Sequence, residues 1–494
     1  MSKTEKNQEL KIKAVRGFFW TLFENLGGQI TQFLTFIVLA RLLAPETFGL
    51  ISLANIFIHF VQALVDSGFS NAIIQRKDLE AEHLNTAFWA NLGIGGVLTV
   101  IGIASSGLVA QFFRQPELAL IISVLSINVL INSLSGTQSA VLTRELNFKG
   151  LTLRKIVSMV TGSVVGITMA GLNFGVWSLV GQTLVSSLVG CILLWRISKW
   201  RPGITVSYKH FVDLFSFGVN FVGIGLLVFF SRRIDDFLIG YFLGATALGY
   251  YTVAYKMFIS LMQIIQHSTQ KVSFTSFSRL QDRPDELRKV LYQCTRLISV
   301  IGIPAFIGMA LVAPEFVPVF FGEQWSASIP IMQVLSFNGV LVAAMSFTGS
   351  FINSLGKPVY NLYLLSLSTV VRSLAFLIFI QQGILAIAVV LVVCNYALLP
   401  TNMWVLWRLA KIEWRKFFQQ IAPSILASIV MAVFVWGFKY ICTSAWELNL
   451  DLRLLLILSI IVGALSYGSV VFFMLPDIYR KISNLVGSAL PSKT

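Results

Sequence analysis

LNTAFWANLGIGGVLTVIGIASSGLVAQFF, residues 84–113, contains no Asp, Glu, Lys or Arg. A helix that spans a membrane needs about 20 consecutive, mostly apolar residues, and this stretch exceeds that length. Residues 118–142, 156–195 and 326–355 are equally free of charged side chains. Because such stretches recur along the chain, we expect an all-α, polytopic membrane protein of about fourteen transmembrane helices.

The composition supports this class. Only 12% of the residues are charged, whereas soluble domains carry about 25%. The formal net charge of +15 would suggest nucleic-acid binding in a soluble protein. Here most of the 37 Lys and Arg residues lie in short loops on one side of the predicted spans. This asymmetry places both termini in the cytoplasm and predicts no nucleic-acid partner.

The two halves of the chain resemble each other at an offset of about 200 residues. ARLLAPETFG (40–49) aligns with GYFLGATALG (240–249), and each segment joins the end of one span to the start of the next. The repeat predicts an N-lobe of six helices (1–210), a C-lobe of six helices (211–412) and two further helices with a tail (413–494). The seventh and eighth spans are expected at about 213–240 and 247–270.

Several short motifs carry a family resemblance, which extends over roughly residues 15–408. They are AIIQR (72–76), RELNFK (144–149), IDDFLIG (234–240), LGYY (248–251) and NSLGKP (353–358). With the segment at 40–49, they make the chain similar to Wzx-type polysaccharide transporters of the multidrug/oligosaccharidyl-lipid/polysaccharide exporter superfamily.

This resemblance implies a flippase in the bacterial inner membrane. It implies that undecaprenyl-diphosphate-linked oligosaccharide moves from the cytoplasmic to the periplasmic leaflet by alternating access, for exopolysaccharide, capsule or O-antigen-type synthesis. Membrane lipids are then expected partners, and a polysaccharide polymerase with its co-polymerase is a possible one. A lipid II or multidrug exporter of the same superfamily is the alternative.

Polar side chains recur at helical spacing inside three predicted spans. Residues three or four apart share one face of a helix, and a polar face of this length should contact water or other helices. The residues that we expect to line a central cavity are Asn25, Gln32, Asn55, His59, Gln62, Gln263 and His267. The alternative is that these groups form hydrogen bonds across helix contacts.

Ionisable residues at membrane depth are costly and are therefore candidate functional groups. The candidate ligands of a lipid diphosphate are Arg232, Arg233, Lys256 and Arg372, since fixed cations offset the desolvation of an anion. The candidate proton or sodium sites are Glu24, Asp66, Asp235 and Asp236. The spacing leaves a second interpretation open, in which Arg232 and Arg233 neutralise the two aspartates within their own helix.

No catalytic, cofactor or metal motif is apparent. The four histidines are scattered without metal-ligand spacing, the four cysteines form no CxxC pair, and no phosphate-binding loop is present. We therefore expect no enzymatic activity, no cofactor and no metal. A membrane polysaccharide polymerase or ligase is disfavoured because the predicted external loops are too short for a catalytic domain.

Overall fold

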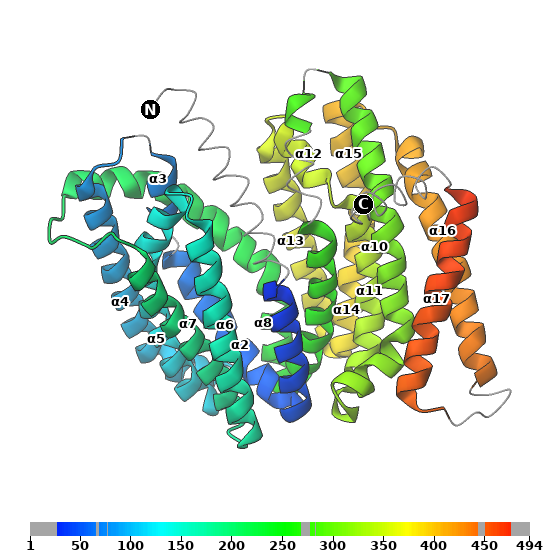
Figure 1. Cartoon of the computed structure of the whole chain (residues 1–494), viewed down its shortest axis with the longest axis horizontal. Coiled ribbons are helices and arrows are strands. Elements are labelled where there is room, and N and C mark those ends of the chain that lie inside the picture. Colours follow the sequence, from blue (N-terminus) through cyan, green and yellow to red (C-terminus); the bar gives the residue numbers. More distant parts are fainter. Residues whose placement is uncertain are drawn as a thin grey trace, which may run out of the picture. The chain divides into compact units, whose positions relative to one another are not determined.

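The structure is a computed structural model that describes residues 27–65, 69–76, 78–267, 277–281, 283–442 and 450–475. Within these ranges the regular structure is entirely helical (Figure 1). A first helix covers residues 27–42. The others are α2 (Pro45–Val65), α3 (Phe69–Gln75), α4 (Ala81–Phe112), α5 (Glu117–Arg144), α6 (Phe148–Gly171), α7 (Val176–Ile197), α8 (Tyr208–His267), α10 (Pro284–Phe320), η1 (Glu323–Trp325), α11 (Ser328–Met345), α12 (Thr348–Ser354), α13 (Pro358–Phe379), η2 (Ile380–Gln382), α14 (Ile384–Ala397), α15 (Leu399–Ala410), α16 (Trp414–Tyr440) and α17 (Leu452–Met474).

Twelve helices of the described chain are long and apolar enough to cross a membrane. The predicted number of about fourteen is compatible with this. Helix α8 counts once among the twelve, although Gly244 interrupts it with φ 85° and ψ 178° between the seventh and eighth predicted spans. The helix at 27–42 adds the described part of the first predicted span. The all-α membrane fold is therefore confirmed.

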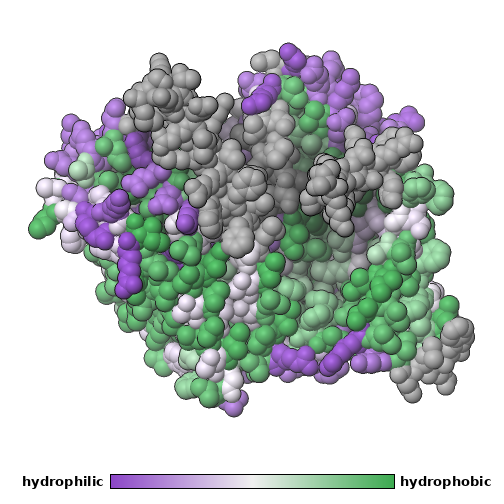
Figure 2. Space-filling view, in the orientation of Figure 1, coloured by the Kyte–Doolittle hydropathy of each residue, from purple (hydrophilic) through white to green (hydrophobic). Residues whose placement is uncertain are grey.

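Apolar side chains cover the outer surface of these helices. In Figure 2, hydrophobic residues extend along the helices and hydrophilic residues gather near their ends. Val97, Leu108, Val433 and Trp436 are among the large apolar side chains that are more than half exposed. A soluble monomer rarely exposes continuous apolar surface, so this surface indicates a multi-pass membrane protein.

The chain divides by its contacts into two units, residues 1–249 and 250–494. In the first unit, α4 packs on α5, α6 packs on α7, and α5 also contacts α7. Small residues allow the close approach: a Cβ added to Gly95 of α4 would lie 1.9 Å from Oγ of Ser133 on α5. Such small-residue contacts are typical of helices that pack within membranes. The lobes predicted at 1–210 and 211–412 were defined by a sequence repeat. The division by contacts does not test that repeat, so the lobes remain a prediction.

The two segments that match in sequence contact each other reciprocally within the first unit. A Cβ added to Gly49 would lie 1.7 Å from the carbonyl oxygen of Ala245, and a Cβ added to Gly249 would lie 1.9 Å from that of Pro45. The two contacts exchange the two copies, because Pro45 aligns with Ala245 and Gly49 with Gly249. A reciprocal contact is what local two-fold symmetry produces.

In the second unit, the long helix α10 contacts α11, α16 and α17. It contains Pro304 and Pro314, each of which removes the hydrogen bond to the carbonyl four residues earlier. Neighbouring helices supply the missing donors. The hydroxyl of Tyr467 on α17 donates to the carbonyl of Val300 at 2.7 Å. The amide of Gln333 on α11 donates to the carbonyl of Ala310 at 3.1 Å. The two proline sites are thus tied to specific partners.

Candidate functional site

The first unit contains a charged cluster in α8 that is built from four residues: Arg232, Arg233, Asp235 and Asp236. The guanidinium of Arg233 donates a 2.8 Å hydrogen bond to Oδ2 of Asp236, three residues later. Both aspartates are buried, at 5% and 6% exposure, whereas Arg232 is exposed. Of the two interpretations that the spacing allowed, local neutralisation is therefore observed for Arg233 and Asp236.

Helix α2 packs antiparallel to this part of α8. Leu53 of α2 contacts Gly240, and further along α2 the ring of Phe60 lies 5.6 Å from that of Phe229. These two contacts bracket the stretch of α2 that holds Asn55 and His59, and the stretch of α8 that holds the charged cluster. The structure thus brings predicted cavity residues of α2 to the level of the predicted charged site.

Lys256 and Gln263 lie on the second part of α8, in the second unit. The side chain of Lys256 is half-buried and that of Gln263 is exposed. Between them, the hydroxyl of Ser260 donates to the carbonyl of Lys256 at 2.8 Å. Lys256, Ser260 and Gln263 share one helical face, as their spacing predicts.

Arg372 lies on α13, a helix with a large exposed apolar surface. Val370 and Leu374 are more than half exposed, whereas Arg372 is half-buried. Its Nε donates to the carbonyl of Ser368 on the same helix at 3.1 Å. Arg372 is therefore less exposed than these apolar neighbours and bonds to the backbone of its own helix.

The remaining predicted residues are placed only in part. Glu24, Asn25 and Asp66 lie outside the described residues, as does the side chain of His267. Gln32 is exposed on the first helix and Gln62 is half-buried on α2. No role in binding or ion coupling follows from these positions, so the roles remain predictions.

The sequence did not predict two contacts between ionisable side chains of different helices. Nζ of Lys439 on α16 contacts the carboxylate of Glu315 on α10, with side-chain exposures of 17% and 8%. It also donates to the carbonyl of Leu311 at 2.7 Å. A second cluster joins His83 to His210. Neither has a signal in the sequence, because the partners are on different helices.

The sequence profile of a family described as "Polysaccharide biosynthesis protein" matches residues 38–330. This match covers more than half of the 494 residues. The chain belongs to this family. The match confirms the family resemblance that the short motifs carried.

Relatives within the family align over most of their length. The teichuronic acid biosynthesis protein TuaB of Bacillus subtilis is 28% identical over 91% of this chain and 93% of its own. The lipopolysaccharide biosynthesis protein WzxC of Escherichia coli is 28% identical over 69% of this chain and 70% of its own.

A solved structure shows the same fold. The lipid II flippase MurJ, in an inward closed conformation, superposes with a TM-score of 0.73 at 13% identity. The match covers 94% of this chain and all of MurJ. This chain therefore shares the fold of that solved structure.

Proposed function

We propose that this protein is a flippase for undecaprenyl-diphosphate-linked oligosaccharide. It moves this lipid from the cytoplasmic to the outer leaflet of the bacterial inner membrane by alternating access, with both termini in the cytoplasm. The observation that carries the proposal is the match to a polysaccharide biosynthesis family in a chain with the fold of a lipid II flippase. The names of TuaB and WzxC refer to the biosynthesis of teichuronic acid and lipopolysaccharide, which fits a saccharide cargo.

Arg233 is the proposed link between substrate and coupling ion. It is paired with Asp236 at 2.8 Å, and Asp236 is almost completely buried. A diphosphate accepts two parallel hydrogen bonds from a guanidinium, so it competes with Asp236 for Arg233. Once Arg233 turns to the phosphate, Asp236 is a buried carboxylate without its counter-ion, which is costly. Uptake of a proton or sodium ion at Asp236 or Asp235 then restores neutrality and couples transport to an ion gradient.

Arg232, Lys256 and Arg372 complete the proposed set of phosphate ligands. Arg232 is exposed, whereas Lys256 and Arg372 are half-buried. Lys256 shares its helical face with polar neighbours, which supports a position toward water. We further propose that a polysaccharide polymerase and its co-polymerase receive the translocated lipid.

The test is reconstitution of the full chain in liposomes that contain a fluorescent undecaprenyl-diphosphate oligosaccharide. We expect dithionite to quench almost all of the lipid with active protein and about half in its absence. The matched control is Arg233→Gln with Asp236→Asn, which removes both charges and leaves the net charge of the helix unchanged. Equal quenching with and without the wild-type protein would refute the proposal.

The same assay separates the alternatives. Faster flipping of lipid II than of other lipid-linked saccharides would favour a lipid II exporter. Accumulation of cationic dyes without lipid flipping would favour a drug exporter. Extension of the saccharide during the assay would indicate a polymerase or ligase instead of a transporter.

A further inference from the structure

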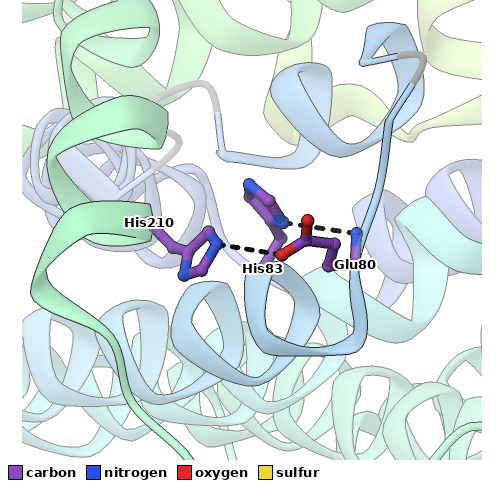
Figure 3. Close-up of side chains that lie close together, drawn as sticks. All are labelled: Glu80, His83 and His210. Carbon is purple, nitrogen blue, oxygen red and sulfur yellow. Dashed lines mark hydrogen bonds and ion pairs between the residues drawn. The ribbon is translucent and has the colours of Figure 1, made fainter.

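Two histidines that are far apart in the sequence meet in the first unit (Figure 3). His83 lies in the first turn of α4 and His210 in the first turn of α8. Their ring centroids are 4.0 Å apart at an interplanar angle of 71°. The two histidines belong to different helices, so only the packing of α4 and α8 brings them together.

Carboxylates surround this pair. Nε2 of His210 lies 3.2 Å from Oε2 of Glu80, and Nδ1 of His210 lies 3.6 Å from Oε2 of Glu82. One ligand atom from each of Glu80, His83 and His210 can be chosen so that all three lie within 4.8 Å of one another. His83 is only 2% exposed, and its Nε2 makes no hydrogen bond with the residues that the structure describes. A buried polar atom in this state has unused bonding capacity.

The segment before α8 is held firmly against α4, which fixes His210. The side-chain oxygen of Asn85 accepts from the backbone N–H of Gly203 at 2.9 Å, and its amide donates to Thr205 at 2.8 Å. The backbone N–H of Ser207 donates to Thr86 at 3.1 Å. These bonds arrange the two histidines before any ligand arrives, which lowers the entropic cost of binding.

We propose that Glu80, His83 and His210 bind a divalent transition-metal ion of the zinc type. Two imidazole nitrogens and one carboxylate oxygen are a donor set that suits Zn²⁺, at distances of about 2.0–2.2 Å. The three ligand atoms must therefore close inward from their present spacing. Glu82 or a water molecule supplies the fourth ligand.

The charges around the cluster fit a dication. Glu80 and Glu82 contribute two negative charges beside the histidines. The nearby cation Arg76 is paired with Asp213 at 3.3 Å. A divalent ion is therefore balanced by the two glutamates.

Metal binding changes the hydrogen bonds at the start of α4. The backbone N–H of Glu80 donates to Nδ1 of His83 at 3.3 Å, so the neutral ring carries its proton on Nε2. Coordination through Nδ1 replaces this bond, and coordination through Nε2 requires the proton to move. In either case the ion, instead of the local bond, fixes the ring.

The site has a mechanical consequence for α8. Arg232 and His210 lie on the same helix. At a rise of about 1.5 Å per residue, Arg232 is about 33 Å further along α8 than His210. An ion that clamps the first turn of α8 to α4 sets the position of the helix that carries the charged cluster. This consequence does not depend on which substrate the protein moves.

The test uses the full chain, purified with a tag that lacks histidine and stripped of metal with a chelator. Zn²⁺ affinity is measured by competition with a chromophoric chelator, and Co²⁺ serves as a spectroscopic probe of nitrogen ligands. We expect one Zn²⁺ per chain, Co²⁺ absorption in the visible range, and a higher Tm with Zn²⁺. His210→Gln and Glu80→Gln should each weaken binding by about tenfold or more, and His59→Gln is the matched histidine control.

The outcomes separate metal binding from a structural role. His83 is buried, so His83→Gln can fail to fold, whereas His210 is only half-buried and its variant decides. A His210→Gln protein with a normal metal-free Tm but no Zn²⁺-dependent rise supports the proposal. Absence of stoichiometric Zn²⁺ in the wild type, or unchanged Zn²⁺ affinity in His210→Gln, would overturn it.

Discussion

Two ion pairs in this protein differ in how their partners are connected. Arg233 and Asp236 are three residues apart on α8, and Arg233 is more than a third exposed. Lys439 and Glu315 join α16 to α10, and both side chains are largely buried. Opening the first pair leaves Asp236 buried without its counter-ion but breaks no link between helices, whereas opening the second leaves Glu315 buried and also breaks a link between α16 and α10. We therefore expect the pair within one helix to be available for function and the pair between helices to stabilise the fold.

The largest expected effect is on the pair between helices. Lys439→Met should lower the free energy of unfolding by about 3–5 kcal/mol, because Glu315 is left as an unpaired buried carboxylate. Thermal unfolding in detergent and the amount of membrane-inserted protein measure this effect. Lys439→Met combined with Glu315→Leu removes both charges and should recover most of the stability. If the single variant is as stable as the wild type, the structural role of this pair is wrong.

The pair within α8 should show the opposite behaviour. Arg233→Gln should reduce polysaccharide export by about tenfold or more, since a charged hydrogen bond contributes about 1.5–3 kcal/mol. The protein level should stay near that of the wild type. Because Asp236 loses its counter-ion, Tm should fall, but by less than with Lys439→Met, since the side chain of Arg233 is 36% exposed and that of Lys439 17%. Complementation of an export-deficient strain, with a blot for protein level, is the measurement. Loss of protein with proportional loss of export would place this pair in the same structural class as Lys439 and Glu315.

Lys256 and Arg372 extend the comparison to the second unit. Lys256→Gln and Arg372→Gln should each reduce export by about tenfold, at the lower end of the range for a charged contact, while membrane insertion remains normal. The same complementation assay applies. Full export from the double substitution would remove both residues from the proposed substrate site.

The smallest effect is expected from exchanging one cation for another in α8. Arg233→Lys keeps the charge but loses the planar, two-pronged donor geometry. We expect about a twofold to threefold loss of export, well below that of Arg233→Gln. A loss as large as that of Arg233→Gln would show that geometry, and not charge, determines the contact.

The sequence predicts local features of this protein far better than distant ones. Long uncharged stretches such as 84–113 predict the spans, because length and polarity alone decide whether a helix can cross a membrane. The spacing of Arg233 and Asp236 predicts their pairing, because residues three apart are neighbours on a helix. Contacts between helices have no such local signal. The pairing of Lys439 with Glu315, and the meeting of His83 with His210, depend on how the helices pack.

The prolines of α10 have a consequence for how its neighbours are aligned. A helix with an uninterrupted hydrogen-bond ladder offers much the same surface after a shift of one turn, about 5.4 Å. Helix α10 offers a different surface after such a shift. The carbonyls of Val300 and Ala310 lack an intrahelical donor and accept hydrogen bonds from Tyr467 and Gln333 instead. Sliding α17 or α11 by one turn would leave a carbonyl without its donor in an apolar environment. The two carbonyls freed by the prolines therefore favour one axial register for α17 and one for α11.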